Sequence, residues 1–176
     1  YKRQVVCHVL RYTPFFSTLK QMVTAGAIGA LQTIDAVEHV AYWHQAHSFV
    51  RGNWRSSQET SPMILAKSCH DMDILRWLAD APCHAVSSFG RLSEFKVENA
   101  PKGAACRCLD GCKVKGTCPY DAEHIYLDHE TTGFRKGAHG WPVTVLCNGE
   151  ASEEKIYEAL KTGPYGRCVY HCDNDV

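Results

Sequence analysis

The sequence predicts a mixed fold of the α/β or α+β class, and three local patterns carry this prediction. Residues 61–78 place apolar side chains three and four positions apart, as an amphipathic helix does. Thr13 and Pro14 have the chemistry of a helix start. Residues 31–43 alternate loosely between apolar and polar side chains, which favours a sheet strand with one face against helices.

The remaining elements follow from similar patterns along the chain. Gly26 and Gly29 should end the first helix near Ala25. Residues 93–128 are rich in Gly, Pro, Lys and Cys and have little apolar periodicity, so they predict a long loop or insertion. The other expected elements are strands over 1–12, 84–92 and 167–172, a short helix over 150–161 and its exit turn over 163–166.

The helix expected over 61–78 carries a tight set of ionisable side chains. Ser61 suits the N-cap position and Pro62 the first helical position. On one continuous helix, Lys67 and His70 lie three positions apart on the same face. The plain alternative is a core helix whose histidine is simply hydrogen-bonded.

Composition narrows the class of protein. The 176 residues are 45% hydrophobic and 22% charged, which is ordinary for one soluble domain with a core. Nineteen basic and nineteen acidic residues give a formal net charge of zero, so electrostatics gives no reason to expect nucleic acid or an anionic membrane as a partner. No run of 18 apolar residues is present. We expect a soluble, cytoplasmic protein.

Four stretches together resemble the glucose-fructose oxidoreductase / inositol dehydrogenase / MocA (GFO/IDH/MocA) family of nicotinamide-dependent sugar oxidoreductases. They are KSCHDMDILRWL from Lys67, CHVLRYTPFF from Cys7, FFSTLKQMVTAGAIGAL from Phe15 and EHVAYWHQAHSFVRGNW from Glu38. The resemblance covers roughly residues 5 to 90. It implies a mainly antiparallel sheet with helices packed on one face, and a homo-oligomer that forms through the open sheet face.

The resemblance also implies a domain organisation. Residues 13–176 would form the substrate-binding and catalytic domain, truncated at its C-terminus, with the cysteine-rich insertion at about 93–128. Residues 1–12 would be the end of a dinucleotide-binding Rossmann domain, or a linker from it, and that domain is otherwise absent from this chain. No G-x-G-x-x-G follows a strand. We therefore expect NAD or NADP to be bound by residues before Tyr1 in the intact protein, and this chain alone to be inactive.

The same resemblance suggests catalytic residues. His70 would move the proton of a substrate hydroxyl, which suits imidazole near neutral pH. Many family members carry an aspartate four residues before this histidine, where this chain has Ala66, so Lys67 is the second catalytic candidate. Asp73 is a candidate to contact substrate or orient the His70 ring, and a helix salt bridge to Arg76 is the alternative.

Polar and aromatic residues after the strand expected over 31–43 are candidates for substrate binding. In the family, the matching loop offers hydrogen-bond donors and an aromatic wall to a polyhydroxylated substrate. The alternative is a polar sheet face or an ordinary loop. The residues concerned are Tyr42, His44, His47 and Arg51, with Trp54 and Arg55 on the expected pocket rim.

The ten cysteines suggest a metal site. Four of them crowd together as Cys106, Cys108, Cys112 and Cys118, and four thiolates can close a tetrahedral zinc shell. The alternatives are reduced free thiols, an iron–sulfur cluster or disulfides. His124 could replace Cys106 as the fourth ligand. Cys168 and Cys172 are spaced so that they could face the same side of the last strand.

Three functions are compatible with these patterns. The first is the substrate-binding and catalytic half of a NAD(P)-dependent oxidoreductase that acts on a sugar, a cyclitol or a related polyol. The second is a glycosidase that uses tightly held nicotinamide for a redox-assisted elimination, as some relatives do. The third is a zinc-stabilised interaction module without catalysis.

Overall fold

The computed structural model describes residues 3–5 and 7–175, and among them it contains helices but no β-strand. The predicted antiparallel sheet is therefore wrong, and a single isolated bridge between Arg107 and Arg167 is the nearest feature to it. The α-helices are α1 (Pro14–Thr24), α2 (Tyr42–His44), α3 (Met63–Ala66), α4 (Cys69–Ala79), α5 (Val143–Leu146) and α6 (Glu153–Thr162). Two π-helical segments cover Gln45–Arg51 and His124–Asp128, and 3₁₀ turns cover Val9–Tyr12, Val97–Asn99, Phe134–Lys136, Pro164–Gly166 and Val169–His171.

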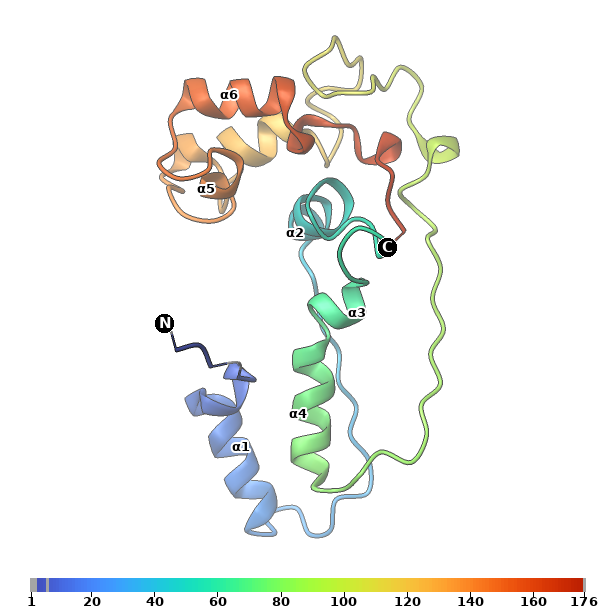
Figure 1. Cartoon of the computed structure of the whole chain (residues 1–176), viewed down its shortest axis with the longest axis vertical. Coiled ribbons are helices and arrows are strands. Elements are labelled where there is room, and N and C mark those ends of the chain that lie inside the picture. The colour runs from blue at the N-terminus through green and yellow to red at the C-terminus, as the bar shows by residue number, and fades with distance from the viewer. Residues whose placement is uncertain (1–2, 6, 176) are drawn as a thin grey trace. The chain divides into compact units, whose positions relative to one another are not determined.

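The expected strands fail for a physical reason. Residues 31–41 and 83–93 run as long traces without regular secondary structure (Figure 1). Their alternation describes the side chains of one segment, whereas a strand exists only when a second segment completes its hydrogen-bond ladder. No such partner is found among the described residues, and Phe89 is 96% exposed. The homo-oligomer expected to form through a sheet face stays a prediction.

The chain divides into two compact units. Unit 1 comprises Tyr1–His39 with Ile64–Phe89, and unit 2 comprises Val40–Met63 with Gly90–Val176. The role of residues 1–12 as the end of another domain stays a prediction, and Tyr1, Lys2 and Val6 lie outside the described residues. Over the part of the chain that is described, no helix is long and apolar enough to cross a membrane.

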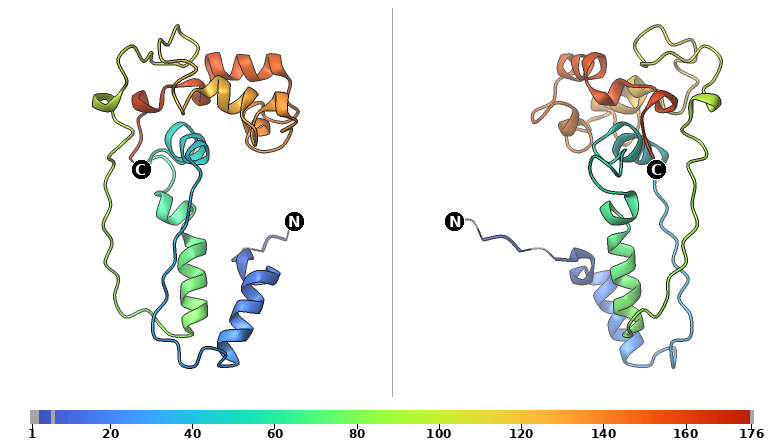
Figure 2. Two further views of the ribbon diagram at one scale, coloured as in Figure 1. Left: turned by 180° about the vertical axis from the view of Figure 1, so that it is seen from behind. Right: turned by 45° about the vertical axis from the view of Figure 1, so that its right-hand side comes forward.

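In unit 1, α1 begins where the sequence predicts. The Thr13 hydroxyl accepts a hydrogen bond from the backbone N–H of Phe16 at 3.4 Å, and Pro14 occupies the first helical position. The chain leaves the helix through Gly26, whose φ of +75° suits glycine. Helices α1 and α4 lie beside each other (Figures 1 and 2), and the Lys20 ammonium donates to the carbonyl oxygen of Trp77 at 2.7 Å.

The continuous helix predicted over 61–78 is divided into α3 and α4. Lys67 and Ser68 lie between the two helices, so the prediction that Lys67 shares a helix face with His70 is wrong. Helix α4 buries Ile74 and Leu78. Leu78 belongs to the apolar face that the spacing predicts, whereas Met72, on the same predicted face, is 51% exposed.

Unit 2 holds the larger core. Ser152 caps α6 by accepting from the backbone N–H of Lys155, which confirms the helix predicted over 150–161. The core gathers fully buried apolar residues of α6, α5 and the π-helical segment His124–Asp128: Ile125, Leu127, Val143, Ile156 and Leu160. The strand predicted over 167–172 is wrong, because Val169–His171 forms a 3₁₀ turn.

Candidate functional site

A polar cluster in unit 1 surrounds the start of α4. His70 lies in the first turn of this helix and Asp73 lies one turn later. Arg11, from the 3₁₀ turn before α1, donates to both carboxylate oxygens of Asp73, with Nε to Oδ2 at 2.7 Å and Nη2 to Oδ1 at 2.5 Å. His8 Nε2 lies 3.8 Å from Asp73 Oδ1, and the His8 ring meets the His70 ring edge-on at 6.2 Å between centroids. The cluster therefore joins two imidazoles to one ion pair.

The ion pair fixes the charge of Asp73. Its side chain is 10% exposed, and the two hydrogen bonds from Arg11 hold the pKa of the carboxyl below its usual range. Electrostatic interactions with His8 and His70 also lower the pKa of Asp73. Asp73 is thus a carboxylate at neutral pH, and its ion-pair partner is Arg11 rather than Arg76, the alternative that the sequence left open.

His70 has an unsatisfied atom. The ring is half-buried, and its Nδ1 is buried without a hydrogen-bond partner among the described residues. Buried polar atoms are nearly always paired in proteins, so an unpaired nitrogen beside a fixed carboxylate is a candidate for binding or proton transfer. Lys67, the other catalytic candidate, is held by Glu38 with Nζ 2.7 Å from Oε1.

The predicted substrate-binding residues of unit 2 separate into two groups. Tyr42 and His44 belong to a surface group of aromatic rings. Tyr42 is 41% exposed and meets Tyr120 and His129 edge-on. The His44 ring stacks on Trp43 and meets Trp141 edge-on at 4.8 Å between centroids. Trp141 is 47% exposed.

His47 and Arg51 form the buried group. His47 is 2% exposed, its Nδ1 lies 2.9 Å from the Tyr126 hydroxyl, and its ring stacks on Tyr165 at 4.6 Å. Burial, and then the neighbouring His44 and Arg51, lower its pKa to about 3. His47 is therefore a neutral core residue at neutral pH.

Arg51 is a buried cation. It is 0% exposed and forms no ion pair with any described residue. Its Nε donates to the carbonyl oxygen of Arg167 at 2.6 Å, and its Nη2 donates to that of Tyr120 at 2.6 Å and to the sulfur of Cys108 at 3.5 Å. Its Nη1 is buried without a hydrogen-bond partner in the part of the chain that the structure describes.

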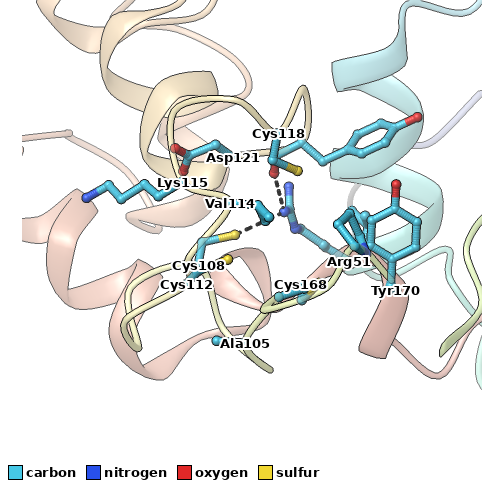
Figure 3. A pocket seen from close by; sticks show the side chains of 14 residues that line it. Arg51, Ala105, Cys108, Cys112, Val114, Lys115, Cys118, Asp121, Cys168 and Tyr170 are labelled. Atoms are coloured by element: carbon cyan, nitrogen blue, oxygen red, sulfur yellow. Dashed lines mark hydrogen bonds between the residues drawn. The ribbon is translucent and has the colours of Figure 1, made fainter. Parts of the chain in front are cut away.

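The cysteines gather around Arg51 (Figure 3). The residues that line a cavity of about 20 Å³ beside it include Cys108, Cys112, Cys118 and Cys168. Three of these are among the four predicted metal ligands, whereas Cys106 is exposed and does not line the cavity. As the side chains stand, no group of three or more His, Cys, Asp or Glu residues in the described ranges is arranged so that it could hold a metal ion.

Several of these residues were missed in the sequence. Arg11 and His8 lie more than 60 positions before their partners on α4, and no short-range pattern points to such a pairing. Cys168 was considered only as part of a strand. Its spacing from Cys172 was a usable signal, since a second cysteine pair in a chain with a cysteine-rich loop suggests a shared site.

Comparison with known proteins adds the family. The chain is 30% identical over 113 residues to the "Putative oxidoreductase YteT" of Bacillus subtilis (strain 168). This match covers 62% of the chain and 26% of the relative, so the chain spans about a quarter of that protein's length. No solved structure matches. The family model of the GFO/IDH/MocA C-terminal domain matches residues 16–118, which include most of α1, all of α4 and three of the four cysteines that line the cavity. Since this match spans more than half of the 176 residues, the chain belongs to the GFO/IDH/MocA C-terminal domain family.

Proposed function

We propose that, in the intact protein, this chain is the substrate-binding and catalytic part of a NAD(P)-dependent oxidoreductase acting on a CH–OH group of a sugar, a cyclitol or a related polyol. The observation that carries the proposal is the environment of His70. Its buried Nδ1 has no hydrogen-bond partner among the described residues, and it lies beside a carboxylate that Arg11 keeps ionised. Membership of the family and the similarity to the oxidoreductase of Bacillus subtilis support the reaction class.

The role of His70 is proton transfer. Oxidation of a secondary alcohol to a ketone releases the hydroxyl proton, and an imidazole can accept it near neutral pH. In the reverse reaction the imidazolium returns the proton to the substrate oxygen. Lys67 is less suited, since Glu38 already pairs with its ammonium.

The nicotinamide group would take up or supply the hydride, but the residues described here do not fit its pyrophosphate. A pyrophosphate site needs a glycine-rich turn that opens a helix N-terminus. Helix α1 starts at Thr13–Pro14 and α4 starts after Ser68, without glycine. The first turn of α6 carries Glu153 and Glu154, which repel phosphate. The proposal therefore assigns only substrate binding and proton transfer to this chain.

The exposed rings of unit 2 suit a carbohydrate-like substrate. The apolar C–H faces of sugars and cyclitols pack against aromatic rings, while their hydroxyls need hydrogen-bond partners. Tyr42 and Trp141 offer partly exposed rings, and Tyr42 also offers its hydroxyl. His44 adds an imidazole to the same group of rings. His47 and Arg51 would act beneath this surface as core residues.

The test is His70→Ala in the intact protein, assayed for NAD(P)-linked turnover of a panel of sugars and cyclitols. Loss of proton transfer should lower kcat by roughly 10²- to 10⁴-fold without changing cofactor affinity. His84→Ala removes an exposed histidine from the same unit and should leave kcat unchanged. If His70→Ala keeps kcat within a few-fold and Lys67→Ala abolishes it, the base is Lys67. Release of the aglycone from a glycoside, with no net NAD(P)H formed, would instead identify the redox-assisted glycosidase.

A further inference from the structure

Two segments of unit 2 that lie far apart in the sequence pair through their backbones beside the cavity that the cysteines line. Arg107 and Arg167 form an antiparallel bridge. The backbone N–H of Cys108 donates to the carbonyl oxygen of Gly166 at 2.9 Å, and that of Cys168 donates to the carbonyl oxygen of Cys106 at 2.9 Å. This pairing brings Cys168 to the cavity that Cys108, Cys112 and Cys118 also line.

The buried charge of Arg51 requires an explanation. A cation in a water-excluded site is costly unless an anion accompanies it. Two backbone carbonyls and one sulfur accept from the guanidinium, but no carboxylate pairs with it in the described ranges. Asp121 also lines the cavity, yet its carboxylate already accepts from the backbone N–H groups of Gly116 and Glu123. The Nη1 of Arg51 is buried without a hydrogen-bond partner among the described residues, so the guanidinium can donate to a further acceptor.

We propose that Cys108, Cys112, Cys118 and Cys168 bind one Zn²⁺ as thiolates, and that Arg51 offsets the negative charge of the complex. Four thiols release four protons and Zn²⁺ takes their place, so the assembly carries two negative charges. The cavity of about 20 Å³ has room for one water-sized centre, which fits a single ion rather than a multi-iron cluster.

Assembly of this shell requires rotation of the cysteine side chains. Each sulfur is one bond from Cβ, so a change of the single χ1 torsion re-aims it without moving the backbone. In the present arrangement the thiols have not closed a shell, and Cys108 accepts from Arg51 instead. On metal binding, Arg51 can keep donating to this sulfur, because a metal-bound thiolate is a better acceptor than a thiol.

The fourth ligand therefore differs from the one that the sequence suggested. Cys106 is hydrogen-bonded through its backbone to Cys168, but its side chain is exposed and outside the cavity. His124, the other candidate, is also exposed. With Cys168 as the fourth ligand the metal would stabilise the fold, because one ion would link the cysteine-rich loop to the C-terminal segment.

Matched cysteine variants test this assignment in the whole 176-residue chain. Protein purified without added metal should contain about one zinc by elemental analysis. Cys106→Ser should keep that stoichiometry and affinity. Cys168→Ser should lose affinity, measured by competition with a chromophoric chelator. The loss should exceed the roughly 10- to 100-fold that removal of a second-layer partner costs, because a direct ligand is gone.

A spectroscopic variant covers the case in which Cys168→Ser fails to fold. Cobalt replaces zinc in the wild-type chain and in Cys168→His, where imidazole can substitute for the thiolate. The sulfur-to-cobalt charge-transfer bands should weaken and the ligand-field bands should shift in Cys168→His, and both should stay unchanged in Cys106→Ser.

Three results would overturn the proposal. The first is purified chain that contains no zinc and takes up neither zinc nor cobalt. The second is equal loss of metal in Cys106→Ser and Cys168→Ser. The third is a non-reduced intact mass lower by two hydrogens for each cysteine pair of the cavity, which would assign the sulfurs to disulfides.

Discussion

Arg11 donates two parallel hydrogen bonds to Asp73, Nε to Oδ2 at 2.7 Å and Nη2 to Oδ1 at 2.5 Å, although the two residues are 62 positions apart in the sequence. Bidentate pairs of this kind fix orientation as well as distance. The pair ties the 3₁₀ turn Val9–Tyr12 to α4 and holds a carboxylate beside His70. The geometry of the candidate site in unit 1 therefore depends on one ion pair.

Replacing Asp73 by Asn should destabilise the chain at neutral pH but not in acid. The folded-state pKa of Asp73 is lowered, so the stabilisation is present above the ordinary value of 3.8 and is lost as the pH falls through the folded-state pKa. Urea unfolding of wild type and Asp73→Asn, followed by circular dichroism, should give curves that differ at neutral pH and converge in acid. Asp71→Asn, two positions earlier on α4, is the control and should unfold like wild type.

Shortening a buried side chain in the core of unit 2 should strongly lower the free energy of unfolding. Ile156 is fully buried on α6, and Ile156→Ala should lower the free energy of unfolding by about 2–5 kcal/mol through lost burial and the cavity left behind. Ile28→Ala makes the same chemical change at an exposed position and should cost less than about 0.5 kcal/mol. Equal unfolding midpoints for the two variants would contradict the assigned core.

The sequence alone predicted those helices whose start or buried face depends on neighbouring residues. Thr13 with Pro14 predicted the start of α1, and the apolar spacing predicted a helix with Leu78 on its buried side. The strands failed because pairing is a property of two segments, and alternation in residues 31–43 describes only one. The split between α3 and α4 was also missed, since apolar spacing continued past Lys67 and gave no sign of a break.

The candidate sites show the same limit. His70 was predicted from the family resemblance, and the cysteine-rich loop was predicted as a site from the crowding of its cysteines. Their partners were not found, because Arg11 and Cys168 come from distant segments, and only the folded chain brings them to Asp73 and to the cavity. Arg51 was assigned to a substrate by family resemblance, whereas its hydrogen bonds are to backbone carbonyls and a sulfur within unit 2.

Arg51→Met should destabilise the zinc-free chain. The change leaves the carbonyl oxygens of Tyr120 and Arg167 without this donor, and each unsatisfied buried acceptor costs about 1–3 kcal/mol. Urea unfolding in the presence of a chelator isolates this effect from metal binding. Arg55→Met is the control, because Arg55 pairs with the exposed Glu59 and such pairs contribute at most about 1 kcal/mol. A smaller effect at Arg51 than at Arg55 would argue against a buried structural role.

The buried His47 should make the stability of the chain depend on pH. Its folded-state pKa is about 3, against an ordinary value of 6.5, so between these values the unfolded chain binds a proton that the folded chain does not. Stability must therefore fall as the pH is lowered from about 6.5 towards about 3, by at most about 1.4 kcal/mol for each pH unit. The physical cause is that an imidazolium at this position would lie in the core and near Arg51.

His47→Asn removes the titrating ring and keeps an amide near the Tyr126 hydroxyl. Although this variant should be less stable at neutral pH, because it loses the stacking on Tyr165, its unfolding free energy should change less over the acid range than that of wild type. His139→Asn replaces an exposed histidine and should keep the wild-type slope. The measurement is the free energy of urea unfolding at several pH values for all three proteins. Parallel curves for wild type and His47→Asn would mean that His47 is protonated equally in the folded and unfolded chains, and the core placement of its ring would then be wrong.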